Sequence, residues 1–121
     1  MNEAEFKRRT KALALRVIRL VAALPKSPAG DVIGKQLLRA GTSVGANYRA
    51  ACRARSPRDM LSKLGIVEEE ADECVYWLEL LGDSKIVRPK LLGDLIREFD
   101  EIVAMIVASK KTLRSGPQSR I

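Results

Sequence analysis

The densest group of chemically capable side chains is a run of five carboxylates at Glu68, Glu69, Glu70, Asp72 and Glu73. Carboxylates at helical spacing can hold metal ions or act as general acids and bases. The chain has no histidine, so it cannot supply the Glu-x-x-His motifs from which di-iron bundles build their sites. We therefore interpret the run as a solvated or interface-forming face, and we predict no metal, no cofactor and no enzymatic activity. A nuclease that uses carboxylates alone is an open alternative that no motif favours.

Two further motifs do not complete a known chemistry. Residues 41–45, Gly-Thr-Ser-Val-Gly, lack the lysine and the preceding strand of a phosphate-binding loop. Cys52 and Cys74 form an isolated pair without metal-ligand spacing, and we interpret both as packing residues of a reduced, cytoplasmic protein. The apolar runs are far shorter than the roughly 20 residues that a membrane span needs, so no membrane association is expected.

Charge is distributed unevenly along the chain, which has a formal net charge of +7. Residues 1–58 carry 13 basic and 3 acidic side chains, residues 59–83 carry 1 and 8, and residues 84–121 carry 8 and 4. Such separation predicts one surface that meets a polyanion and a second that meets a basic partner, such as another copy of the chain. An ordinary solvated basic surface is the alternative.

The periodicity of apolar residues predicts four helices and no strands. Seams at alternating spacings of three and four run through residues 60–81 and 92–113, as in helical bundles. With short connections, these helices predict an all-α, antiparallel up-down-up-down four-helix bundle over residues 1–114, followed by a mobile tail at 115–121. The expected helices are residues 3–24, residues 31–53 with Asp31 as N-cap, residues 57–81 with Ser56 as N-cap and Gly82 as stop, and residues 89–113.

Two apolar features exceed what a single bundle needs. Small residues at positions 34, 41, 45 and 52 share one side of the second helix and indicate the close approach of another helix, from a neighbouring subunit or from the same chain. Three apolar residues of the third helix lie off its seam and favour a subunit contact over packing beneath a loop. We therefore predict an oligomer with the interface residues Gly41, Gly45, Ile66, Trp77 and Leu80.

Basic residues of the first half suggest nucleic-acid binding. Four cations of the second helix lie within about 80° of one another, opposite its core stripe. Arginine dominates these positions, which suits bidentate phosphate contacts, and the scarcity of aromatic residues argues against base stacking. A protein scaffold, in which the arginines pair with the acidic helix of a neighbouring subunit, is the competing hypothesis. The candidate contacts are Arg8, Arg9, Arg16, Lys35, Arg39, Arg49, Arg53 and Arg55.

Residues 36–81, QLLRAGTSVGANYRAACRARSPRDMLSKLGIVEEEADECVYWLELL, resemble the bacterial four-helix-bundle family named after the 23S rRNA intervening-sequence protein. The similar pattern comprises Gln36-Leu37, Arg39, Ser43 and Asn47, followed by the capped, acidic third helix, and similarity extends over about residues 3–114. Many members have Ala-Glu-Gly shortly after the asparagine, whereas this chain continues with residues 48–51, Tyr-Arg-Ala-Ala, which adds positive charge.

The resemblance implies a homopentamer of four-helix bundles arranged as a barrel with a central channel. It also implies similarity to the accessory variability protein of diversity-generating retroelements, a basic pentamer that binds nucleic acid and a reverse transcriptase. Ribosomal RNA or another nucleic acid, and a protein such as a reverse transcriptase, are therefore the partners that the resemblance implies.

Overall fold

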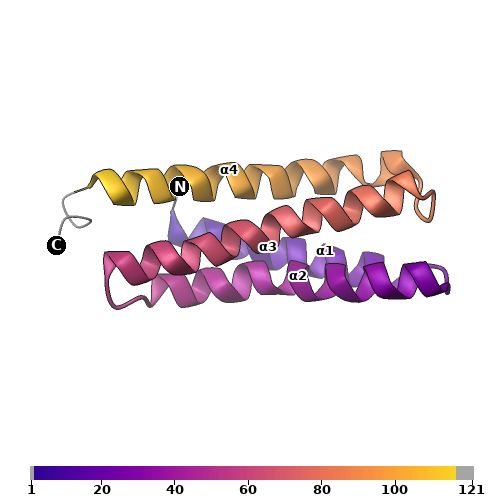
Figure 1. Ribbon diagram of the computed structural model, residues 1–121, viewed down its shortest axis with the longest axis horizontal. Coiled ribbons are helices and arrows are strands. Elements are labelled where there is room, and N and C mark those ends of the chain that lie inside the picture. The colour runs from indigo at the N-terminus through magenta and orange to yellow at the C-terminus, as the bar shows by residue number, and fades with distance from the viewer. Residues whose placement is uncertain (1, 117–121) are drawn as a thin grey trace.

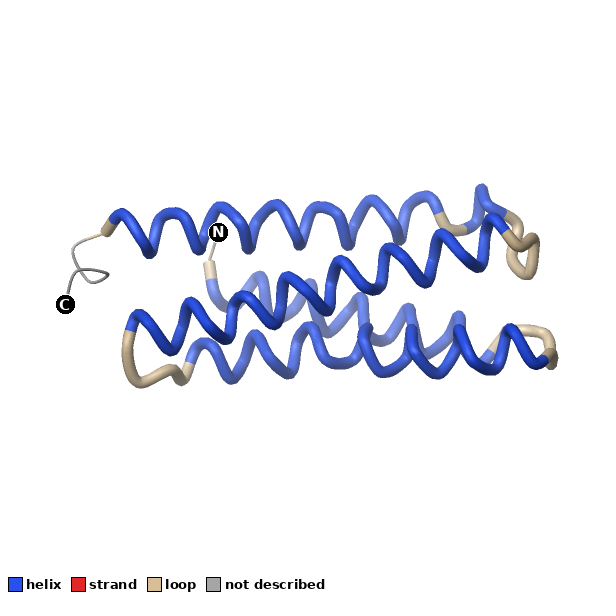
Figure 2. The backbone as a smooth tube through the Cα atoms, viewed as in Figure 1, coloured by secondary structure: helices blue, strands red, loops and turns tan. Residues whose placement is uncertain are grey.

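The computed structural model describes residues 2–116, which form four long helices and one short 3₁₀ helix (Figure 1). The long helices are α1 (Glu3–Ala22), α2 (Pro28–Cys52), α3 (Pro57–Asp83) and α4 (Gly93–Ser115), and η1 (Pro89–Leu91) precedes α4. Consecutive helices run antiparallel and are joined by short loops, with no strand in the described part of the chain (Figure 2). The predicted all-α four-helix bundle is confirmed. Most of the tail predicted to be mobile, residues 117–121, lies outside the described residues, and Ser115 is still helical.

Serine followed by proline starts both central helices. The Ser56 Oγ accepts a hydrogen bond from the Asp59 N–H at 3.1 Å, as predicted. The predicted start of α2 at Asp31 is wrong, because the Ser27 Oγ accepts from the Gly30 N–H at 2.9 Å and caps the helix four residues earlier. Pro28 therefore occupies the first turn, where its missing N–H is not needed, rather than a loop.

The connection between α3 and α4 also differs from the prediction. Gly82 does not stop α3, which continues to Asp83, and the left-handed residue that turns the chain is Lys85, with φ of 65°. The Val87 N–H donates to the Leu81 carbonyl at 3.1 Å, so the chain folds back over the end of the helix. The predicted fourth helix is interrupted at its start, because residues 89–91 form a 3₁₀ turn before α4 begins.

The predicted seams of α3 and α4 lie in the core, together with buried residues of α1 and α2. In α3, six successive seam residues from Leu64 to Leu81 are buried, and in α4 the buried residues include Phe99 and Ile106. The seam ends, Met60 and Leu113, are only partly buried. Fully burying an aliphatic or aromatic side chain stabilises a fold by roughly 1.5–3 kcal/mol, so these seams hold the helices together.

The small-residue stripe of α2 packs against α1 of the same chain. A Cβ added to Gly41 would lie 2.9 Å from a γ carbon of Val17, and one added to Gly45 would lie 3.1 Å from the Thr10 Oγ1. Gly34 faces Leu24 in the same way, at 3.1 Å. Packing within one chain therefore accounts for Gly41 and Gly45, which were predicted as oligomer contacts, and their missing side chains bring α1 close to α2.

Candidate nucleic-acid interface

A basic groove runs along the outer side of the contact between α1 and α2. Because the glycines draw the two helices together, longer side chains on either side enclose a space of about 290 Å³. Three cations converge on it, Lys7 and Lys11 from α1 and Arg49 from α2, and no carboxylate lines it. The Lys7 Nζ lies 2.9 Å from Glu3, whereas Lys11 and Arg49 have no ion pair among the described residues. Its other lining residues are Thr10, Ala14, Thr42, Gly45 and Ala46.

Further cations extend this basic groove along the two helices. Lys35 lies on the same exposed side of α2 as Arg49, Arg53 is exposed at the C-cap of α2, and Arg8 is exposed one position after Lys7 in α1. The predictions from sequence included Lys35, Arg49, Arg53 and Arg8 but omitted Lys7 and Lys11. The omitted pair has a recognisable signal, since residues four apart on a helix share a face.

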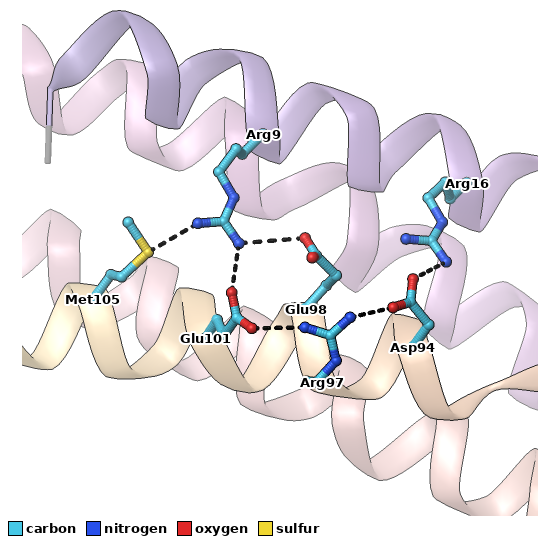
Figure 3. A network of polar contacts seen from close by, with 7 residues as sticks. All are labelled: Arg9, Arg16, Asp94, Arg97, Glu98, Glu101 and Met105. Atoms are coloured by element: carbon cyan, nitrogen blue, oxygen red, sulfur yellow. Dashed lines mark hydrogen bonds and ion pairs between the residues drawn. The ribbon is translucent and has the colours of Figure 1, made fainter.

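Arg9 points away from the basic groove and toward α4. Its Nη2 lies 3.0 Å from Glu101 Oε1 and 3.3 Å from Glu98 Oε2, and its Nη1 donates to the Met105 Sδ at 3.3 Å (Figure 3). Burial tends to lower the pKa of Arg9, but hydrogen bonds to Glu101 and Glu98 outweigh it and raise that pKa above its ordinary value. The charge of Arg9 is therefore balanced inside the chain.

Arg16 is held by the same network. Its Nη2 lies 3.1 Å from Asp94 Oδ2, and Arg97 bridges Asp94 and Glu101 (Figure 3). Hydrogen bonds from Arg97 and Arg16 hold the pKa of Asp94 below its ordinary value. The backbones of α1 and α4 approach each other much less than those of α1 and α2, so this ion-pair network spans the wider of the two gaps.

Arg39 is paired with the acidic run of its own chain. It contacts Glu73 and lies 2.8 Å from Glu70, while the Trp77 indole N–H donates to Glu73 at 3.0 Å. Burial tends to raise the pKa of Glu73, but hydrogen bonds from Trp77 and Arg39 outweigh it and hold that pKa below its ordinary value. The predicted attraction between arginines and the acidic helix thus occurs within one chain at Arg39.

The side of α3 predicted to meet another subunit is only partly covered. Trp77 is half-buried and packs against the core, and Leu80 is also half-buried. Ile66 is 40% exposed. Tyr76, which the sequence-based prediction omitted, is 54% exposed and packs edge-on against Trp77 with ring centroids 5.0 Å apart.

Neither a metal cluster nor a membrane span is found within residues 2–116. No three or more cysteine, aspartate or glutamate side chains there are arranged to hold a metal ion. None of the helices there is long and apolar enough to cross a bilayer.

Comparison with known proteins identifies the family. The family model described as 23S rRNA-intervening sequence protein matches residues 2–108. The chain belongs to this family. A solved structure from Bacteroides thetaiotaomicron VPI-5482, described as a protein with unknown function from the S23 ribosomal protein family, shares 34% sequence identity and superimposes with a TM-score of 0.83. The match covers 88% of this chain and 99% of that chain, and no curated protein matches significantly.

Membership in the 23S rRNA-intervening sequence protein family confirms the resemblance predicted from residues 36–81. The matched residues include the whole basic groove and the ion-pair network between α1 and α4. Membership does not assign a ligand or a reaction, because the structural relative is itself described as having unknown function.

Proposed function

We propose that the protein binds the phosphate backbone of RNA or DNA, with little sequence specificity and without catalysis, through the basic groove between α1 and α2. The observation that carries this proposal is the convergence of Lys7, Lys11 and Arg49 on a groove without a lining carboxylate. Phosphate contacts from lysine and arginine supply most of the sequence-independent affinity for nucleic acids.

The floor of the basic groove suits a phosphate group. Gly45 and Ala46 are small, so an anion can come close to the helix surface between the cations. The Thr42 hydroxyl is already used, since it donates to the Leu38 carbonyl at 2.8 Å. Cationic side chains are therefore the main donors, and the expected contact is electrostatic.

Low sequence specificity follows from the position of the aromatic residues. None lines the basic groove, and the two exposed or half-exposed aromatic side chains, Tyr76 and Trp77, lie on α3. Sequence-specific recognition of single strands depends on bases stacked on such side chains or bonded at their edges. The names of the family and of its structural relative make ribosomal RNA the first ligand to test.

Fluorescence anisotropy with labelled 23S rRNA hairpin fragments and with single-stranded DNA tests this proposal. Three neutralised phosphates predict a loss of affinity of about 20- to 40-fold between 50 and 200 mM salt. The Arg49→Ala variant should reduce the slope of log affinity against log salt by about one. An absence of binding to both nucleic acids at about 50 mM salt would overturn the proposal.

A protein scaffold is the second candidate, and the uncovered side of α3 favours it. Ile66 and Tyr76 are exposed there beside Glu69 and Asp72, which have no ion pair among the described residues. A homo-oligomer, such as the homopentamer that the resemblance implies, or an accessory role beside a protein such as a reverse transcriptase would use this side. Light scattering separates the candidates, because only the scaffold predicts that Arg49→Glu dissociates the assembly.

A further inference from the structure

At one end of the bundle only α2, α3 and α4 pack together, because α1 does not reach it. Arg9 pairs with Glu98 and Glu101, and Arg16 pairs with Asp94, so positions nearer the start of α1 correspond to positions nearer the end of α4. This register places Glu3 opposite about residue 107, and α4 continues to Ser115. About eight residues of α4, or roughly 12 Å, therefore extend beyond α1. Figure 1 shows α4 continuing past the start of α1.

An apolar groove of about 1290 Å³ occupies the position that α1 leaves open. Its apolar lining comes from three helices and includes Cys52 of α2, Met60 and Leu64 of α3, and Met105 and Leu113 of α4. Met60 and Leu113 are the half-buried ends of otherwise buried seams. This terminal groove is thus the part of the core that lacks a covering helix.

Cations outnumber carboxylates around the terminal groove. Arg55 lines it, and Arg53, Arg58 and Lys111, which are exposed and have no ion pair among residues 2–116, adjoin lining residues in the sequence. Two carboxylates lie close by, Glu3 beside Cys52 and Asp59 beside Arg55. No carboxylate is among its lining residues. An apolar floor with a basic rim is complementary to an amphipathic helix whose polar side is acidic. Residues 117–121 have the wrong composition for this role, because they contain Arg120 and no acid.

We propose that the terminal groove docks a short amphipathic helix with an acidic polar side, contributed by a partner protein. The docked helix completes the four-helix arrangement over the last turns of α4. Its apolar side covers the half-buried Met60 and Leu113, and its carboxylates face Arg55. No residue lines both the terminal groove and the basic groove between α1 and α2, so the two interactions can be tested separately.

A synthetic peptide of about 16 residues, with leucine on one helical side and glutamate on the other, provides the probe. A matched peptide with lysine in place of glutamate keeps the apolar side and reverses the charge. We expect the acidic peptide to bind in fluorescence anisotropy and to show an increase in helical circular dichroism. The lysine peptide should bind at least about tenfold more weakly, and Arg55→Glu should reduce that preference.

Two exposed alanines of α4 give a matched pair of variants. Ala108 lines the terminal groove, whereas Ala104, one turn earlier, does not. Ala108→Glu should weaken binding of the acidic peptide at least about tenfold, and Ala104→Glu should change it less than about twofold. Both variants should keep the RNA affinity of the unmodified protein, so failure of peptide docking is distinct from failure of nucleic-acid binding.

Three outcomes would overturn the docking proposal. One is equal affinity for the acidic and lysine peptides, and another is equal weakening by both alanine substitutions. The third is a solution mass that rises with protein concentration and returns to that of a monomer in Ala108→Glu, because the terminal groove would then hold a second copy of the chain.

Discussion

Substitution of Gly41 by alanine tests whether α1 is seated on the glycine stripe of α2. Its new Cβ would lie 2.9 and 3.0 Å from the two γ carbons of Val17 and 3.1 Å from the Val17 Cβ. Val17 is fully buried, and a β-branched side chain in a helix has one strongly preferred rotamer. Rotation of Val17 therefore cannot relieve the contact, and α1 itself must shift.

The expected change in stability on Gly41→Ala is the sum of two opposing contributions. Replacing glycine by alanine inside a helix is favourable by about 0.8–1 kcal/mol, whereas overpacking a buried contact is unfavourable by about 1–3 kcal/mol. Gly41→Ala should therefore destabilise the protein by about 1 kcal/mol. Gly65→Ala is the matched control in α3, because the nearest atom to its new Cβ is the Lys110 Nζ at 3.9 Å. The control should stabilise the protein by up to about 1 kcal/mol.

Urea denaturation followed by circular dichroism measures both free energies of unfolding, which should differ by about 2 kcal/mol. The Val17→Ala background supplies a double-mutant cycle, since removal of the γ carbons should make Gly41→Ala at least about 1 kcal/mol more favourable. If Gly41→Ala stabilises the protein as much as Gly65→Ala does, α1 does not pack on this stripe and the reasoning is refuted.

Two further predictions concern acid stability and thiol reactivity. The lowered pKa of Asp94 means that its contacts with Arg16 and Arg97 stabilise the fold above the unfolded pKa of about 3.9, and that this contribution is lost as the pH falls through the lower folded value. Asp94→Asn should therefore lose less stability than the unmodified protein between pH 5 and about pH 2 in urea titrations, and an identical loss would contradict this account. Burial raises the pKa of the Cys74 thiol to about 12 and also raises that of the partly exposed Cys52. A thiol-reactive disulfide reagent should thus label only Cys52 in the folded protein, slowly, and rapid labelling of both thiols would contradict the packing of α3.

The helices and their buried sides could be predicted from the sequence, because the spacing of apolar residues shows which side of each helix faces the core. Two of the helix-boundary errors arose where local chemistry is ambiguous. The prolines and glycine of residues 25–30 predict a loop, although Ser27-Pro28 repeats the Ser56-Pro57 signal that starts α3. Gly82 predicts the end of α3, although glycine also remains helical where neighbouring residues continue the hydrogen-bonding pattern.

The pairing of charged side chains could not be predicted, since it depends on which helices are neighbours and on their relative register. Arg9, Arg16 and Arg39 look equivalent to Arg49 in sequence, yet the first three face carboxylates across a helix contact. The spacing of the glycines predicted a close helix contact but could not identify the helix. Lys11 became a site residue only when α1 was placed beside Gly45 and Arg49.

Nucleic-acid binding through the groove between α1 and α2 is tested most directly by comparing Arg49→Glu with Arg88→Glu. Both arginines are exposed and have no ion pair among the described residues, and both substitutions change the net charge equally, but Arg88 lies in the loop after α3. With a labelled 23S rRNA hairpin at about 100 mM salt, Arg49→Glu should weaken binding at least about tenfold and Arg88→Glu less than about threefold. Equal weakening by the two substitutions, or no weakening by Arg49→Glu, would contradict binding at this groove.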